Sequence, residues 1–205
     1  MKKLLLLLIA PLLGIGQISA TVDENGKKVL LNNDGTWSYK SQNKAEFEGT
    51  GIWKVGYFVD EFGDPTDNGY VSNNYYIEGT FSNSATSNSD LNSVFIISKK
   101  SRVALQLYEY AGRNPVKAYS TKDYSIIVKD GNGEKHSMTG TMYEGGDRIF
   151  FDTSSRKNDI SRMHNILEGG GNTTVVIKDT EYGLSTYKIQ FNADGYKNAS
   201  DRILN

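Results

Sequence analysis

Most of the chain after residue 51 alternates apolar and polar positions with a period of two. In the clearest run, Trp53, Val55, Tyr57 and Val59 share one face, and similar faces recur at 75–81, 103–107, 124–128 and 187–191. This period is typical of strands that bury one side. Short unbroken apolar runs at 94–97, 149–151 and 175–177 indicate strands that are buried on both sides.

Turn-forming residues separate these runs. Clusters of Gly, Pro, Asn, Asp and Ser lie at 82–90, 112–115, 130–133, 145–147 and 179–183. Such residues reverse the chain because Gly accepts a positive φ and because Asn and Asp bond to their own backbone. The strands do not alternate with helical segments, as they would in a parallel sheet. We therefore expect an all-β protein, with an antiparallel β-sandwich or a flattened barrel as its architecture.

One segment near 158–168 has helical spacing instead. Ile160, Met163, His164 and Leu167 recur three or four positions apart, and three consecutive glycines follow. This pattern predicts one short helix that begins at an Asn158 cap, crosses an end of the sandwich and stops at the glycines.

The last residues also have an apolar face at helical spacing. Tyr196, Ala199 and Ile203 lie on it, and Asp194 precedes it. We expect a C-terminal amphipathic turn or helix that begins at an Asp194 cap and packs on the sheet.

Residues 1–20 have the composition of an export signal. Lys2 and Lys3 precede an apolar stretch, and Ala20 closes a small-residue cleavage site. The apolar stretch is too short to span a bilayer comfortably. We expect cleavage after Ala20, a periplasmic or extracellular location in a bacterium, and no transmembrane segment in the mature chain.

The remaining residues are expected to form three parts. Tight-turn dipeptides at 25–26 and 34–35 predict a small β-meander over 21–40, with strands at 28–31 and 36–39. Residues 41–50 are polar and weakly patterned, and they are predicted to be a linker. Residues 51–205 carry the alternating pattern and are predicted to form the β-sandwich domain.

Charge and cysteine content narrow the function classes. The 205 residues include 23 Lys and Arg against 24 Asp and Glu, a net charge of −1. Loss of Lys2 and Lys3 with the signal leaves 21 basic against 24 acidic side chains, a net charge of −3. Nucleic-acid binding needs a clustered excess of Lys and Arg, so no nucleic-acid partner is expected. The absence of cysteine excludes disulfides, thiolate metal sites and cysteine nucleophiles.

Two blocks of sequence carry a resemblance to known proteins. WKVGYFVDEFGDPTDNGYV, GTFSNSAT and LYEY lie within 53–110, and LEGGGNTTVVIK and YKIQFNADGYKNA lie within 167–199. Together they resemble an uncharacterised family of small exported bacterial β-proteins. The second block is also similar to the invasion-associated locus B family, which is taken to be a periplasmic β-sandwich. The resemblance implies an exported β-sandwich, and it supplies no catalytic residues.

The densest cluster of charged residues follows the best-patterned strand. Asp60, Glu61, Asp64 and Asp67 lie within eight positions, and Tyr70 comes shortly after them. Four carboxylates so close together would be costly to bury unpaired. We therefore expect them to be exposed, or neutralised by a cation or by basic side chains, and we take these five residues as the candidate binding site.

Part of this cluster matches a calcium loop. Asp64, Thr66 and Asn68 occupy ligand positions one, three and five, and Gly69 occupies position six. Position twelve, where a bidentate Glu belongs, is Tyr75. No cofactor is therefore expected, calcium binding is the alternative, and metal ligands stay unassigned.

Enzymatic motifs are missing from the sequence. Neither His136 nor His164 has a second histidine at ligand spacing, and no serine-hydrolase, zinc-protease or phosphate-loop motif occurs. A glycosidase-like pair of Glu109 with Glu61 or Glu78 is the enzymatic alternative. We expect a protein without enzymatic activity.

Aromatic composition favours a binding role. The 13 tyrosines are set among Asn and Ser, and Tyr supplies contact area at low entropic cost. The plainer explanation is that Tyr suits half-exposed strands. We expect an exported or envelope-associated protein that recognises a protein or glycan partner through the 60–70 and 82–90 loops at one sheet end. An envelope hydrolase that uses scattered carboxylates and a purely structural component are the alternatives.

Overall fold

The computed structural model describes residues 18–21, 28–31, 37–39, 49–98, 102–151, 158–181 and 183–203. The chain divides into two compact units, Met1–Glu46 and Phe47–Asn205, and each is described by itself. Within the described residues, no helix is both long enough and apolar enough to cross a membrane.

The first unit contains a three-stranded antiparallel sheet. Its order is β1 (Ile18–Thr21), β2 (Lys28–Leu31) and β3 (Trp37–Tyr39), with β2 in the centre. Strands β2 and β3 lie where the meander was predicted, whereas the turn dipeptides and residues 41–48 of the predicted linker lie outside the described residues. Strand β1 spans the predicted cleavage site, so cleavage after Ala20 would leave only Thr21 of it.

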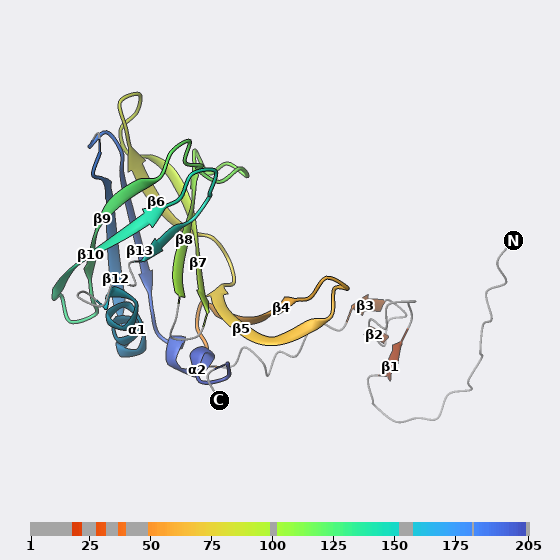
Figure 1. The fold of residues 1–205 in the computed structure, drawn as a ribbon. Helices are drawn as coiled ribbons and strands as arrows, with labels where there is room; N and C mark the ends of the chain where they lie inside the picture. The colour runs from red at the N-terminus through yellow and green to blue at the C-terminus, as the bar shows by residue number, and fades with distance from the viewer. Residues whose placement is uncertain are drawn as a thin grey trace, which may run out of the picture. The chain divides into compact units, whose positions relative to one another are not determined.

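The second unit is a closed β-barrel with two outer strands (Figure 1). Eight antiparallel strands close the barrel in the order β6-β13-β12-β9-β10-β11-β8-β7, and β7 pairs back with β6. The strands of this unit are β4 (Trp53–Val59), β5 (Pro65–Asn73), β6 (Ile77–Ser82), β7 (Ser89–Ser98), β8 (Arg102–Glu109), β9 (Lys122–Lys129), β10 (Lys135–Met142), β11 (Ile149–Phe151), β12 (Asn172–Asp179) and β13 (Thr186–Asn192).

The predicted all-β antiparallel class is confirmed. Of the two architectures expected from the sequence, a barrel is observed and the sandwich is wrong. Each barrel strand pairs with a neighbour on both edges, so the ladder runs around the barrel instead of splitting into two sheets. Alternation along a strand shows which face is buried. It does not show whether that face meets a second sheet or the inside of the same one. The interior is filled by alternate side chains, among them Phe81, Phe95, Leu105, Ile126 and Met142.

Helix α1 (Asp159–Gly169) lies where the sequence predicts a helix. Ile160, Met163, His164 and Leu167 are buried as expected, and the helix ends at Gly170, which has a φ of 71°. Asn158 occupies the N-cap position, but the prediction that it caps the helix is wrong. Its backbone is left-handed, with a φ of 43°, and its side chain makes no capping hydrogen bond.

The start of α1 takes the place of a missing strand on the edge of β10. Strand β11 pairs only with Gly140 and Thr141 of β10. Beyond that point, the Thr139 amide donates to Asp159 Oδ2 at 2.9 Å, and Arg162 Nη1 donates to Ser137 O at 3.1 Å. The helix therefore satisfies backbone groups that an exposed strand edge would leave open.

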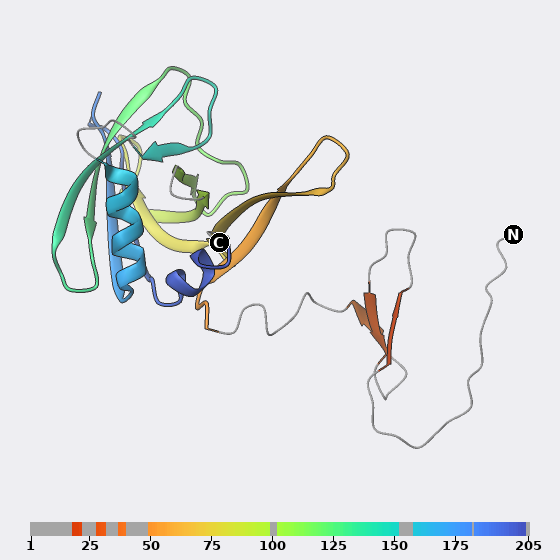
Figure 2. The same ribbon diagram turned by 60° about the horizontal axis from the view of Figure 1, so that its bottom comes forward.

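Helix α2 (Tyr196–Ser200) closes the same part of the molecule as α1 (Figure 2). Tyr196, Ala199 and Ile203 are buried, as the sequence pattern predicts. The predicted Asp194 cap is wrong, because Gly195 occupies the N-cap position. Asp194 Oδ1 instead accepts a hydrogen bond from the Gly171 amide at 2.7 Å.

Strands β4 and β5 form a hairpin that extends away from the barrel (Figures 1 and 2). Strand β5 meets the barrel where Val71 and Ser72 pair with Ile97 and Ile96 of β7. Strand β6 pairs with the preceding part of the same β7 edge. Between these two ladders the Asn73 side chain donates to Ser93 O and accepts from the Phe95 amide. A side-chain amide thus bridges the gap where the hairpin leaves the barrel.

Candidate functional site

The β4–β5 hairpin is anchored by Trp53 at its base. Trp53 is fully buried, and its indole Nε1 donates to Ala193 O at 3.1 Å. Its ring makes edge-to-face contacts with Phe95, Phe191 and Tyr196, with centroids 5.2 to 6.2 Å apart. Trp53 therefore packs between the barrel wall and α2.

The outer half of the hairpin exposes apolar side chains. Exposed fractions are 47% for Tyr57, 40% for Phe58, 61% for Val59 and 83% for Phe62. The sequence predicts that Tyr57 and Val59 share the buried face of Trp53, and for these two residues the prediction is wrong. They lie on the part of the strand that extends beyond the barrel, where roughly half of each side chain is exposed.

The tip of the hairpin is a three-residue turn closed by Asp60 and Asp64. Asp60 N donates to Asp64 O at 2.9 Å, and Gly63, with a φ of 88°, provides the left-handed position. Asp60 Oδ1 accepts the amides of Phe62 and Asp64, both at 2.9 Å. The Asp60 side chain is therefore fixed by its own turn and leaves its second oxygen free of these bonds.

The predicted site residues divide into two groups on this hairpin. Asp60, Glu61, Asp64 and Asp67 are all exposed, as the repulsion argument requires. Tyr70 lies further down and packs elsewhere. Its ring contacts Phe58 at a centroid distance of 4.9 Å and covers Gly56, where an added Cβ would meet the ring at 2.5 Å. Tyr70 thus stiffens the hairpin and is not part of the acidic tip.

The predicted calcium-loop match is not supported by the backbone. Asp64 closes the turn, and Thr66, Asn68 and Gly69 lie in β5, which is extended. Thr66 Oγ1 donates to Phe58 O at 2.8 Å across the hairpin. A calcium loop must instead curl its ligands around one point.

The second predicted loop, 82–90, lies away from the hairpin tip. It joins β6 to β7 before Ser89, whereas β5 meets β7 at Ile96 and Ile97. At about 3.3 Å per residue this separates the two attachment points by roughly 20–25 Å along β7. The loop is closed by its own hydrogen bonds, including those from the Ala85 and Thr86 amides to Asn83 Oδ1. The two loops therefore leave β7 near opposite ends, and the prediction that they form one binding surface at one sheet end is wrong.

The carboxylates proposed for a hydrolase do not converge. Glu109 is in register with buried Leu91 and accepts a hydrogen bond from Tyr187 at 2.9 Å. Glu78 is exposed and is in register with Asn92, the next position of β7. Adjacent positions on a strand face opposite sides. Glu61 lies at the distant hairpin tip.

The hydroxyl of Tyr187, which donates to Glu109, stays neutral. Burial, together with the nearby Glu109 charge, raises the pKa of Tyr187.

A second turn of the same kind lies between β9 and β10, where the sequence predicts a turn at 130–133, but the group of side chains around it is not predicted. Asp130 Oδ1 accepts the amides of Asn132 and Glu134, both at 2.9 Å, and Gly133 has a φ of 87°. Asp130 Oδ2 lies 3.0 Å from His136 Nε2. Among the described residues, Asp130, Glu134 and His136 form the one group whose ligand atoms are close enough together to hold a metal, all within 4.8 Å of one another.

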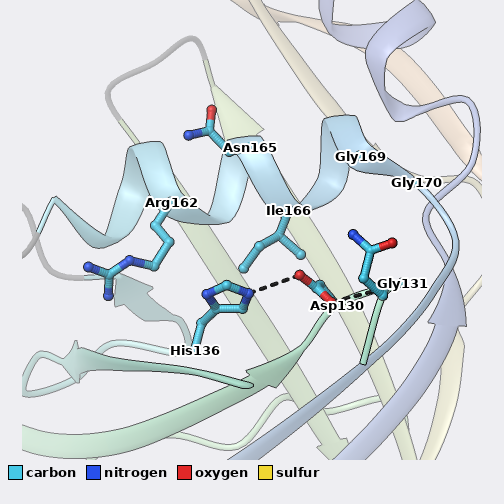
Figure 3. Close-up of a pocket in the computed structure, with 9 residues that line it drawn as sticks. Asp130, Gly131, His136, Arg162, Asn165, Ile166, Gly169 and Gly170 are labelled. Atoms are coloured by element: carbon cyan, nitrogen blue, oxygen red, sulfur yellow. Dashed lines mark hydrogen bonds and ion pairs between the residues drawn. The ribbon is translucent and has the colours of Figure 1, made fainter. Parts of the chain in front are cut away.

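This turn borders a pocket of about 360 Å³ beneath α1 (Figure 3). His136 and Asp130 face each other there, and Ile166 points toward them from the helix. The hydrogen bond from His136 is the main cause that lowers the pKa of Asp130, and the two backbone amides add to it. His136 has no second histidine at ligand spacing, so the common metal motifs do not identify this group. The useful signal was an acid that closes a tight turn, with a histidine two positions beyond the turn.

A third feature is a shallow pocket of about 400 Å³ on the barrel beside the hairpin base. Tyr76 and Tyr108 contact each other there at a centroid distance of 5.2 Å, and Tyr75 is exposed. Its most buried amides already have partners, because Asn73 bridges β5 to β7 and Gln106 donates to Asp147. Much of the exposed aromatic surface comes from Tyr75 and Tyr76 here and from Tyr110, Tyr119 and Tyr143 elsewhere.

Comparison with known proteins gave no relative. No model of a protein family matches the chain, and neither a curated protein nor a solved structure does. The expected relationship to exported β-sandwich families therefore stays a prediction.

Proposed function

We propose that this chain is an exported, non-enzymatic binding protein whose β4–β5 hairpin docks on another protein. The partner surface is an apolar groove that is rimmed by basic residues. The observation that carries the proposal is the group of exposed apolar side chains on a hairpin that extends beyond the barrel, with Phe62 83% exposed at its tip.

The anchoring of the hairpin supports this role. Trp53 and the Asn73 bridge fix its base, and Gly69 packs so closely under Ile203 that an added Cβ would come within 2.5 Å of it. The tip is held in one turn conformation by Asp60. Presenting aromatic side chains on a rigid support reduces the entropy lost on binding.

Charge favours a basic protein as the partner. The exposed apolar group shares its hairpin with four exposed acids, Asp60, Glu61, Asp64 and Asp67. The described salt bridges join other residues. Interfaces with complementary potentials gain association rate and specificity. Aromatic anchors that fill a pocket supply most of the affinity in such interfaces.

The same charges argue against two other occupants. A second copy docked tip to tip would bring eight carboxylates together, which is repulsive. An anionic envelope glycan would be repelled in the same way, and a neutral glycan would gain nothing from the acidic rim. Both remain distinguishable outcomes of the experiment below.

The test places a photo-crosslinking amino acid at Phe62 in the full chain, expressed in the envelope of a bacterial host. The matched control carries the same group at Tyr119, which is 95% exposed on a different loop. We expect a protein adduct from position 62 that is absent from position 119 and whose linked peptide is apolar with flanking Lys or Arg. The purified partner should then bind Phe62→Ser at least tenfold more weakly than the parent protein, and high salt should weaken the parent complex.

Three results would contradict the proposal. They are an adduct between two copies of this chain, an adduct only to glycan, and an affinity that Phe62→Ser leaves unchanged. Tyr119→Ser serves as the binding control, since it removes an aromatic of similar exposure elsewhere.

Export is part of the proposal and has its own test. Residues 1–20 carry the signal-like composition, and cleavage after Ala20 predicts an intact mass of the secreted protein that begins at Thr21. Retention of the leading segment would contradict it.

A further inference from the structure

We propose that Asp130, Glu134 and His136 form a binding site for a first-row divalent transition metal such as Zn²⁺. The site lies at the β9–β10 turn, opens into the pocket beneath α1, and is independent of the hairpin proposed to bind a protein.

The first ligand, Asp130, is held in place before any metal binds. Its Oδ1 accepts two backbone amides of its own turn, which fixes the carboxylate and directs Oδ2 toward His136. A ligand that is already oriented loses little freedom on metal binding.

The second and third ligands follow from the register of the turn. Glu134 closes the turn, because its carbonyl accepts the Asp130 amide at 3.0 Å, and His136 lies two positions on, so its side chain points to the same side of β10. His136 Nε2 and Asp130 Oδ2 lie 3.0 Å apart. Two ligands about 2.1 Å from a metal lie roughly 3.0–3.4 Å from each other, so this pair has suitable spacing. Glu134 is exposed and can swing in to complete the set.

The ligand types decide which metals fit. One imidazole with two carboxylates suits Zn²⁺, Mn²⁺, Fe²⁺, Co²⁺ or Ni²⁺, whereas Ca²⁺ and Mg²⁺ prefer oxygen ligands alone. Three protein ligands would leave further coordination positions of the metal open to water or to a small ligand. Ile166, which is buried, points toward the imidazole from α1 and gives that side of the pocket an apolar wall (Figure 3).

The test titrates Zn²⁺ alone into the full chain after chelator treatment, with calorimetry and with NMR of the imidazole signals. We expect saturable binding of one Zn²⁺ per chain, a shift of the His136 signal, and a rise in melting temperature, since a ligand that binds only the folded state stabilises it. His136→Gln should weaken binding at least tenfold, and Glu134→Gln should weaken it less.

The matched control is Asp64→Asn, in a turn that has Thr66 where this one has His136. It should bind Zn²⁺ as the parent protein does. Equal Zn²⁺ affinity in a folded His136→Gln would overturn the proposal, as would Ca²⁺ binding as tightly as Zn²⁺ or a shift of the His164 signal alone. A circular dichroism spectrum like that of the parent shows that a variant is folded. A variant that fails this check is replaced by His136→Asn, on which the same outcomes decide.

Discussion

The β4–β5 and β9–β10 hairpins close with the same turn and differ in what surrounds it. In both, an Asp accepts two amides of its own turn at 2.9 Å, and a Gly with a φ of 88° or 87° completes the loop. The first turn exposes Phe62 at the tip of an extended hairpin. The corresponding residue of the second is Asn132, and that turn lies against α1.

The comparison shows that the same Asp and Gly give the two turns the same backbone conformation. The residues next to each turn decide what the hairpin can bind. Two positions after the turn, β5 has Thr66, which bonds across to Phe58 O, whereas β10 has His136, which bonds to Asp130. The first hairpin is attached only near its base and can present side chains to a partner. The second is attached along its length and encloses a pocket.

The largest expected effect separates the base of the β4–β5 hairpin from its tip. Trp53→Ala removes a fully buried ring and its hydrogen bond to Ala193 O, and should lower the free energy of unfolding by about 3–5 kcal/mol. Phe62→Ala, at an exposed tip, should change it by less than about 0.5 kcal/mol. Urea denaturation of both variants measures the difference. Equal losses would show that the tip is buried against something and would remove the basis for a docking hairpin.

The next effect compares equivalent positions of the two turns. An added Cβ at Gly131 would meet Gly170 O at 2.5 Å, a backbone atom that cannot simply rotate away. Gly131→Ala should therefore cost about 1–3 kcal/mol, as other overpacking changes do. Glu61→Ala, at the corresponding exposed position, should stay within about 0.5 kcal/mol. Thermal unfolding measures both variants. If Gly131→Ala changed the stability as little as Glu61→Ala does, the second turn would not be packed against the end of α1.

Much of the fold could be predicted from local patterns. Alternation located strands such as Trp53–Val59 and Lys122–Lys129, and the spacing of Ile160, Met163 and Leu167 located α1. These signals are local, because a buried face repeats along its own element. Closure of the barrel depends on the pairing of β13 with β6, more than 100 residues apart, and no local pattern encodes that partner.

The candidate sites were partly predictable for the same reason. Exposure of Asp60 and Asp64 follows from repulsion between neighbours in sequence. Only the first half of β4 lies against the barrel, and the length of that contact is set by residues far away in the sequence. The predicted burial of Tyr57 and Val59 is therefore wrong. His136 and Asp130 are six positions apart, and the predicted turn at 130–133 does not by itself show that the hairpin brings their side chains into contact.

A smaller effect concerns the pH dependence of the second turn. The hydrogen bond from His136 holds the pKa of Asp130 below its ordinary value of 3.8. A lowered folded-state pKa gives stability that is present above about pH 3.8 and is lost as the pH falls through the lowered value. In metal-free protein, the melting temperature of Asp130→Asn should therefore lie below that of the parent at neutral pH, by a few degrees at most, and the gap should close in acid. The control is Asp60→Asn in the first turn, which has Thr66 at the position that corresponds to His136. It shows the effect of losing the turn charge alone. A gap that stays constant into strong acid would contradict the His136 contribution.

The smallest effect on stability is expected from removing charge at the hairpin tip. In the double variant Asp60→Asn with Asp64→Asn, the amide oxygen at position 60 can still accept the amides of Phe62 and Asp64. All four acidic side chains of the tip are exposed, so the free energy of unfolding should change by less than about 0.5 kcal/mol. Calorimetric titration with calcium should give no heat of specific binding for the parent or the variant, because β5 is extended where a calcium loop would have to curl. Association with a basic partner should slow in the variant, and the loss should shrink as salt screens the tip. A large fall in melting temperature in the presence of EDTA would show instead that these carboxylates hold the hairpin together, and the tip would then be a structural element and not a docking surface.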